Sequence, residues 1–135
     1  MKKMNIKEWT EVYFRHKDLF EKSLDNIKEE ENHLILEYKN RKDVAILRPV
    51  FDDSIFEELH TLENKYDKKF IVCSKASTNV EFLIKNWKRF LIKKLVIIFV
   101  DIITNNKILI NTYLHNMVSD TDKLDISVKT LFANQ

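Results

Sequence analysis

The chain contains no glycine among its 135 residues and only one proline, Pro49. Ordinary usage would place glycine at about 7% of positions. Glycine adopts positive φ at little cost and lets a backbone approach a phosphate closely. Its absence therefore excludes glycine-rich nucleotide-binding loops, the EF-hand loop and the G-x-S-x-G nucleophile elbow. We expect every left-handed turn to use Asn or Asp instead, because these residues tolerate positive φ better than the others do.

The length and composition predict one folded domain that spans residues 1–135. Hydrophobic residues make up 44% of the chain and charged residues 33%, which is enough apolar material for a sizeable core. A single cysteine, Cys73, excludes an internal disulfide and is typical of a cytoplasmic protein. No segment reaches the roughly 20 apolar residues that a membrane-spanning helix needs, so we expect no membrane partner.

The first half of the chain changes from helical to strand periodicity. Apolar residues recur at helical spacing over 6–28, and Asn5 stands at the N-cap, so we predict one long helix there. Alternating apolar residues over 33–38 and 44–48 predict two strands of a hairpin. In the absence of glycine, we expect Asn40 to take any positive φ in the polar turn between them.

The second half predicts a β-α-β unit followed by a hairpin. Its elements are a helix over 54–66, strands over 70–73 and 95–103 with a helix over 78–94 between them, a strand over 107–114 and a helix from Asp120–Asp122 onward. Strands joined by a helix pair in parallel with a right-handed crossover. The fold class is therefore mixed α/β (α+β), a single domain with a central sheet of about five strands and the order α-β-β-α-β-α-β-β-α.

The predicted helix over 78–94 has a basic outward face. Residues 71–110 contain seven basic residues and only two acidic ones, although the whole chain has a net charge of only +2. Clustered cations attract phosphates and give salt-dependent binding. The sequence thus predicts contact with the DNA or RNA backbone through this helix, extended by the hairpin turn. The candidate residues are Lys85, Lys88, Arg89, Lys93 and Lys94, with Lys39, Arg41 and Lys42.

The order of the elements suggests a nuclease-like arrangement. A leading helix comes first in the chain. A hairpin bearing Glu37 and Asp43 comes next, and a strand ending in Cys73-Ser74-Lys75 comes later. This order resembles the core of the PD-(D/E)xK superfamily, which includes restriction enzymes and archaeal Holliday-junction resolvases. The resemblance implies that Asp43 matches the family's aspartate and Lys75 matches the lysine of its acid-x-Lys motif.

The same comparison predicts a degenerate metal site. In the family, these carboxylates bind a divalent metal that activates water. Cys73 stands where the second acid belongs, and sulfur is a poor Mg²⁺ ligand because hard cations prefer oxygen. We also expect Glu37 and Asp43 to face each other across the hairpin, where nearby cations would neutralise them. The main hypothesis is therefore a nucleic-acid-binding domain that does not cut and needs no cofactor.

Two alternatives remain open at the level of sequence. The chain is a structural or protein-interaction module, in which an edge strand or the final helix pairs with a partner or a second copy. Otherwise it is an active Mg²⁺-dependent nuclease that uses Glu37, Asp43 and Lys75. The four histidines lack the spacing typical of a zinc site, so no other metal is expected.

Overall fold

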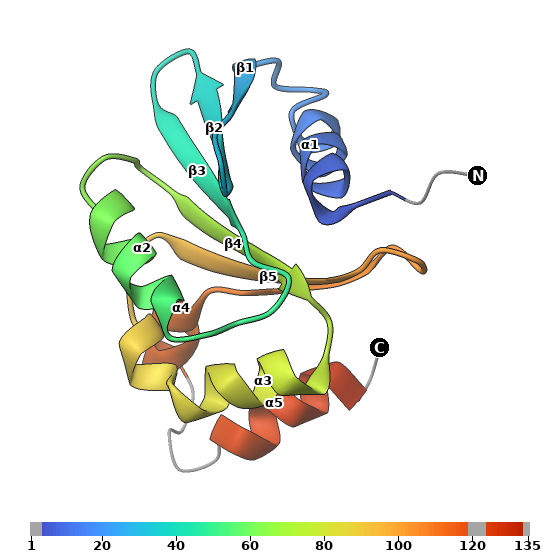
Figure 1. Cartoon of the computed structure of the whole chain (residues 1–135), viewed down its shortest axis with the longest axis vertical. Helices are drawn as coiled ribbons and strands as arrows, with labels where there is room; N and C mark the ends of the chain where they lie inside the picture. The colour runs from blue at the N-terminus through green and yellow to red at the C-terminus, as the bar shows by residue number, and fades with distance from the viewer. Residues whose placement is uncertain (1–3, 119–123, 134–135) are drawn as a thin grey trace.

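A computed structural model describes residues 4–118 and 124–133 of the chain (Figure 1). The elements in chain order are α1 (Ile6–Lys17), β1 (Leu24–Glu29), β2 (His33–Tyr38), β3 (Lys42–Leu47), α2 (Ser54–Leu62), β4 (Lys69–Ser74), α3 (Ser77–Lys85), the 3₁₀ turn η1 (Trp87–Phe90), β5 (Leu95–Asp101), β6 (Asn106–Ile110), α4 (Thr112–Val118) and α5 (Leu124–Ala133).

One six-stranded mixed sheet organises the fold, and its strands lie in the same order as in the sequence. The three central strands β3, β4 and β5 are parallel, whereas the pairs towards both edges are antiparallel. Val72 of β4 lies opposite Ile98 of β5, as a β-α-β unit requires. The predicted mixed α/β single-domain class is thus confirmed, with one strand more than the five or so expected.

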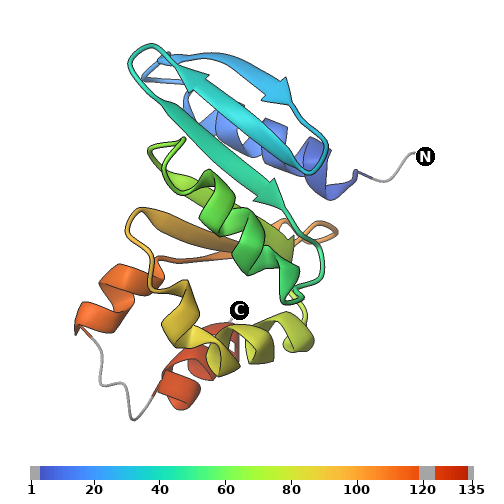
Figure 2. The same cartoon turned by 60° about the vertical axis from the view of Figure 1, so that its left-hand side comes forward.

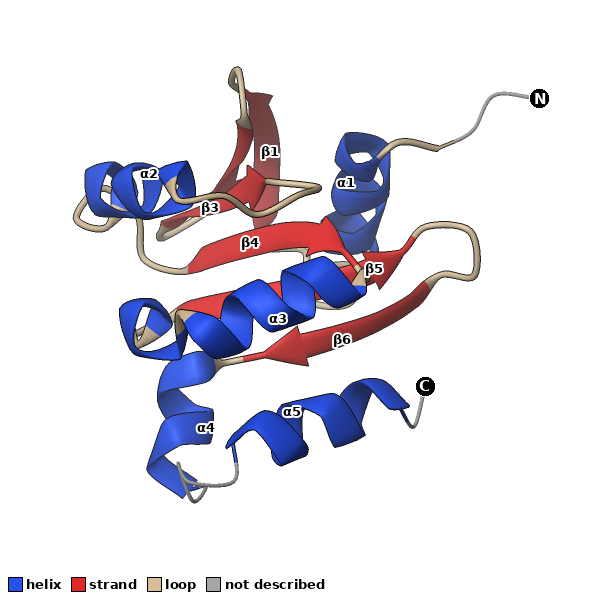
Figure 3. Ribbon diagram, turned by 60° about the horizontal axis from the view of Figure 1, so that its bottom comes forward, coloured by secondary structure: helices blue, strands red, loops and turns tan. Residues whose placement is uncertain are grey.

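Helices cover both faces of this sheet. On one face, Trp9 and Phe14 of α1 pack with Phe70 and Val72. On the other face, α2, α3, η1 and α5 enclose the larger apolar cluster, and Figure 3 shows α3 in front of the parallel strands. Every side chain from Phe70 to Cys73 is buried, because a central parallel strand is covered on both sides. No described helix has the length and apolar content to cross a membrane.

The predicted helix over 6–28 is wrong in its second half. Asn5 caps the helix as expected, its side-chain oxygen accepting the Glu8 N–H at 2.8 Å, but α1 ends at Lys17 and β1 follows. A register irregularity between Leu24 and Asn26 places an extra residue in β1. Leu24 and Ile27 therefore both pack on the α1 cluster, and their spacing of three imitates a helix.

The predicted basic helix over 78–94 is also shorter than expected. α3 ends at Lys85, and Asn86 closes it by donating from both its backbone N–H and its side-chain amide to the Phe82 carbonyl. The turn η1 and an irregular segment follow before β5 begins. The predicted strand over 107–114 stops at Ile110, where α4 takes over after one residue. The predicted start of the final helix at Asp120–Asp122 lies outside the described residues.

The left-handed turns do not follow the expectation from the sequence. Among the described residues, positive φ occurs at Lys22 (52°), Lys94 (61°) and Asn105 (62°), and Asn40 is not among them. Two of the three positions are thus lysines, for which the left-handed region is less favourable than it is for Asn. Each lysine directly precedes or closely approaches the start of a strand, β1 for Lys22 and β5 for Lys94.

Candidate nucleic-acid interface

The fold brings both predicted basic segments to one edge of the sheet. Because β3, β4 and β5 are parallel, the turns that lead into them lie at the same end. The Asp67 N–H donates to the Lys42 carbonyl at 2.8 Å, and the Lys69 N–H donates to the Lys94 carbonyl at 2.9 Å. Segments 39–42, 63–69 and 85–94 are therefore neighbours, and Figure 2 shows the three turns along its left side. We call these three segments the basic edge.

The basic edge separates charge within the molecule. Its three segments contain eleven Lys or Arg and only two Asp or Glu, whereas the rest of the chain contains twelve basic and nineteen acidic residues. The net charge of +2 is therefore the sum of a strongly positive basic edge and a negatively charged rest of the chain. A field of this shape attracts and orients a polyanion.

The lysines of the basic edge differ in how they are held. Lys85 and Lys88 are exposed, and neither forms an ion pair within the part of the chain that the structure describes. Lys42 Nζ lies 3.6 Å from a Glu37 carboxylate oxygen, while Lys94 Nζ lies 2.6 Å from Asp67 Oδ1. Lys69 is buried, with its Nζ 3.4 Å from the Glu63 carbonyl oxygen, so the charge left for an external anion is that of the exposed cations.

Aromatic rings position the two arginines. The Arg89 guanidinium lies 3.7 Å from the centroid of the Phe56 ring, and that of Arg41 lies 4.1 Å from the centroid of Tyr38. Stacking on a ring restrains a guanidinium and leaves N–H groups at its rim to donate. Lys93 Nζ lies 5.7 Å from the Tyr113 ring centroid in a looser arrangement of the same kind. These cations are therefore partly ordered before any ligand arrives.

The structure does not bring Glu37 and Asp43 together. Across the hairpin, Leu36 lies opposite Asp43 and Glu37 lies opposite Lys42. The predicted register was wrong by one residue, and a slip of one residue moves a side chain to the other face. Glu37 instead accepts from the Asn26 side-chain amide at 3.0 Å, which with the ion pair to Lys42 lowers the pKa of its carboxyl group.

Asp43 has a structural environment at the base of the basic edge. Its side chain is 1% exposed, and its carboxylate accepts the Lys68 N–H at 3.1 Å and Arg41 Nε at 3.3 Å. These contacts hold the turn before β4 against the start of β3. The carboxylate thus orders two basic segments at once.

Lys75 lies at the opposite end of the sheet from Asp43. Asp43 is level with Lys68, which directly precedes the neighbouring parallel strand β4, and Lys75 comes seven residues later. At about 3.3 Å per residue, the two are roughly 23 Å apart, too far to share one metal ion. Among the described residues, no group of three His, Cys, Asp or Glu side chains is placed to hold a metal. The arrangement therefore offers cationic contacts, and among the described residues it does not bring Asp43 and Lys75 to one site.

Sequence reasoning missed the segment between α2 and β4. Lys65 and Lys68 are exposed and lie between the two predicted basic segments. A signal was present, because Lys68 directly precedes β4 and the pair Lys93-Lys94 directly precedes β5. Parallel strands begin at one edge, so lysines before two such strands indicate one shared basic surface.

No protein-family model, curated protein or solved structure matches this chain. The resemblance to the PD-(D/E)xK superfamily and the alternative role as an interaction module or homo-oligomer therefore stay predictions. Any functional conclusion depends on the geometry of the side chains themselves.

Proposed function

We propose that this chain binds the sugar-phosphate backbone of nucleic acids through its basic edge. The observation that supports the proposal is the meeting of segments 39–42, 63–69 and 85–94, with eleven basic and two acidic residues, at one end of the sheet. Each phosphate neutralised by a lysine or arginine releases condensed counterions, and this release favours binding. Such contacts position a protein on nucleic acid without reading its sequence.

The spacing of the parallel strands suits a backbone ligand. Neighbouring strands lie about 4.8 Å apart, so the turns before β3, β4 and β5 place cations across about 10 Å. The long side chains of Lys42, Lys68 and Lys93 widen that reach. A surface of this size contacts several successive phosphates rather than a single mononucleotide.

The arrangement favours binding without cleavage. Asp43 is engaged by the Lys68 N–H and the Arg41 guanidinium, and Lys75 is at the far end of β4. In the proposed function, Asp43 holds Arg41 and the turn before β4 in place and takes no part in phosphate chemistry.

Charge reversal at the basic edge tests the proposal. We expect Lys85→Glu/Lys88→Glu to weaken binding of a labelled 20-base-pair duplex more than tenfold at 100 mM salt, with melting temperature nearly unchanged because both side chains are exposed. In fluorescence anisotropy titrations, the plot of log K against log salt should also become shallower, since each lost phosphate contact removes about 0.9 from the slope.

A matched control changes charge by the same amount elsewhere. Lys28→Glu/Lys75→Glu reverses one lysine on edge strand β1 and one at the far end of β4. This control should bind within about twofold of the wild type. An equal loss in both double variants, or wild-type binding that does not weaken with salt, would contradict the proposal.

A further inference from the structure

A groove of about 630 Å³ runs along α1, between this helix and the turn that joins β5 to β6. Its lining is mainly apolar and aromatic, with a few polar and cationic groups. The lining residues are Met4, Trp9, Val12, Tyr13, His16, Lys17, Ile102, Asn105 and Lys107. The proposed function uses none of them.

Two stacked aromatic rings form one wall of the groove. The Trp9 and Tyr13 ring centroids lie 5.1 Å apart at an interplanar angle of 10°. Trp9 Nε1 donates to Asn105 Oδ1 at 2.8 Å, which ties the β5–β6 turn to α1. Trp9 is buried, whereas Tyr13 is only partly buried and offers part of its surface to the groove. The Asn105 hydrogen bond therefore holds Trp9 in place, while Lys107 Nζ lies over the Tyr13 ring and has to move aside for a flat ligand to stack there.

The polar groups of the groove suit an anionic ligand with hydrogen-bond acceptors. Lys17 Nζ lies 5.6 Å from the Phe70 ring centroid and Lys107 Nζ lies 5.7 Å from that of Tyr13, and neither pairs with a carboxylate in the part of the chain described. The Asn105 side-chain oxygen accepts from Trp9, and the amide nitrogen of Asn105 makes no hydrogen bond within the described residues. An aromatic surface beside lysines that form no close ion pair within the described residues favours a heteroaromatic anion over a purely apolar peptide.

The groove is continuous with the basic edge through Lys17. This residue also lines a smaller cavity of about 130 Å³ that includes Arg41 and Lys68 together with the carboxyl groups of Asp18, Glu21 and Asp43. Lys17 therefore stands between the surface proposed to hold phosphates and the surface able to hold a ring. A strand whose backbone crosses the basic edge reaches the groove within a few nucleotides.

We propose that this groove receives an unpaired base of single-stranded nucleic acid, stacked against Tyr13, while the neighbouring phosphates lie on the basic edge. The inference rests on the proposed function and narrows its ligand. A duplex keeps its bases stacked inside the helix and cannot use the groove without unpairing. The groove should thus add affinity for single strands alone.

The test compares single-strand and duplex binding in variants of Tyr13. Tyr13→Leu removes the stacking surface but keeps an apolar side chain, and should weaken binding of a 20-nucleotide single-stranded DNA about 5- to 150-fold. Duplex binding should change by less than twofold. Tyr13→Phe keeps the ring and should bind single strands like the wild type. This variant still tests the proposal if the leucine variant folds poorly, because a loss of single-strand binding with the ring intact would contradict stacking.

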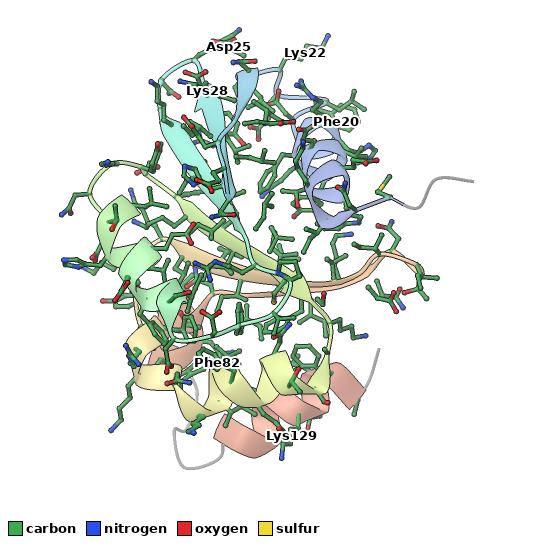
Figure 4. The ribbon with its side chains drawn as sticks, in the orientation of Figure 1. Phe20, Lys22, Asp25, Lys28, Phe82 and Lys129 are labelled. Atoms are coloured by element: carbon green, nitrogen blue, oxygen red, sulfur yellow. The ribbon has the colours of Figure 1, made fainter. Side chains whose placement is uncertain are left out.

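A matched control removes an exposed aromatic residue outside the groove. Phe20 follows α1, is 92% exposed and does not line the groove (Figure 4). Phe20→Leu should leave the ratio of single-strand to duplex affinity unchanged. Photo-crosslinking of an oligonucleotide containing 5-iodouracil should label the α1 peptide that contains Tyr13.

The outcomes separate this inference from the proposed function. If Tyr13→Leu binds single strands like the wild type while Lys85→Glu/Lys88→Glu loses binding, the groove is not a base site but the basic edge still binds backbone. Crosslinks confined to segments other than α1 lead to the same conclusion. If the wild type binds neither single strands nor duplex, both the proposed function and this inference are wrong.

Discussion

Lys94 Nζ lies 2.6 Å from Asp67 Oδ1, and this ion pair joins the turns that lead into β4 and β5. The hydrogen bond from Lys94 is the main reason that the pKa of the Asp67 carboxyl group is lowered. The carboxylate consequently stays charged until the pH falls below its ordinary value of about 3.9. Any stability that the pair contributes is present above that pH and is lost as the pH falls through the lowered pKa.

Removing the Asp67 charge should strengthen nucleic-acid binding. Asp67→Asn keeps an acceptor for Lys94 but removes one of the two acidic charges of the basic edge. We expect affinity for a 20-base-pair duplex at low salt to rise several-fold and the salt dependence to steepen, because Lys94 becomes available to a phosphate. Anisotropy titrations at several salt concentrations measure both effects, and weaker binding by this variant would contradict the assigned role of the basic edge.

Asp43 should matter for stability and not for phosphate cleavage. Asp43→Ala leaves the Lys68 N–H and the Arg41 guanidinium without their buried acceptor, so we expect a loss of about 1–3 kcal/mol in the free energy of unfolding. Urea denaturation measures this loss, and Asp43→Asn should lose less because it keeps an acceptor. Mg²⁺-dependent cleavage that disappears in both Asp43→Ala and Lys75→Ala would show instead that the chain is a nuclease.

The central strand β5 should dominate the stability of the sheet. Ile98 is 0% exposed, and Leu109, directly opposite it on edge strand β6, is 43% exposed. Ile98→Ala should cost about 2–5 kcal/mol, since it leaves a cavity between two covered faces. Leu109→Ala is the control and should cost clearly less than Ile98→Ala, because nearly half of the Leu109 surface is already exposed. Equal losses would show that β5 is not central to the core.

A glycine placed at a left-handed lysine should stabilise the protein. Lys22 has a φ of 52°, where a residue with a Cβ is strained. Lys22→Gly should raise the free energy of unfolding by about 0.5–1 kcal/mol, the relief of strain exceeding the added entropy of the unfolded chain. Lys28→Gly in strand β1 should lower it instead. Chemical denaturation of both variants decides whether the strain at Lys22 is real.

The Cys73 thiol should react only after unfolding. Burial raises the pKa of this thiol well above its ordinary value. The unfolded thiol ionises near pH 8.5, so above that pH the unfolded state releases a proton that the native state retains, and stability falls as the pH rises. Ellman's reagent at pH 8 should find almost no thiol in the native protein and one equivalent in guanidinium chloride. Rapid labelling of the native protein would contradict the burial of Cys73.

The centre of the fold was predictable because its signals are strong and local. The continuous apolar runs from Phe70 to Cys73 and from Leu95 to Val100 are typical of β-strands that are buried on both faces. The helix between these two strands requires them to be parallel. Strand β1 was not predictable, because an edge strand has only a few apolar residues and its bulge gave Leu24 and Ile27 a helical spacing.

The basic edge was predictable in most of its residues but not in its shape. Lys85 and Lys88 stand out in the sequence, but the meeting of segments 39–42, 63–69 and 85–94 depends on strand order, which the spacing of residues does not encode. The groove beside Tyr13 was not predicted from the sequence, because Trp9 and Tyr13 have the spacing of ordinary core residues on α1. The prediction that Glu37 and Asp43 face each other depended on the register of the hairpin, and a shift of one residue moves a side chain to the other face of the sheet.

The sheet has the same order in space as in the sequence, which has a consequence for how the chain reaches its fold. Each strand pairs only with the strands next to it in the chain, so the formation of each strand pair needs no segment from a distant part of the sequence. Loop-closure entropy is smallest for such nearest-neighbour pairing, and folding rates rise as contacts become more local. During synthesis, the sheet can therefore grow from β1 towards β6 as the chain emerges from the ribosome, one strand at a time.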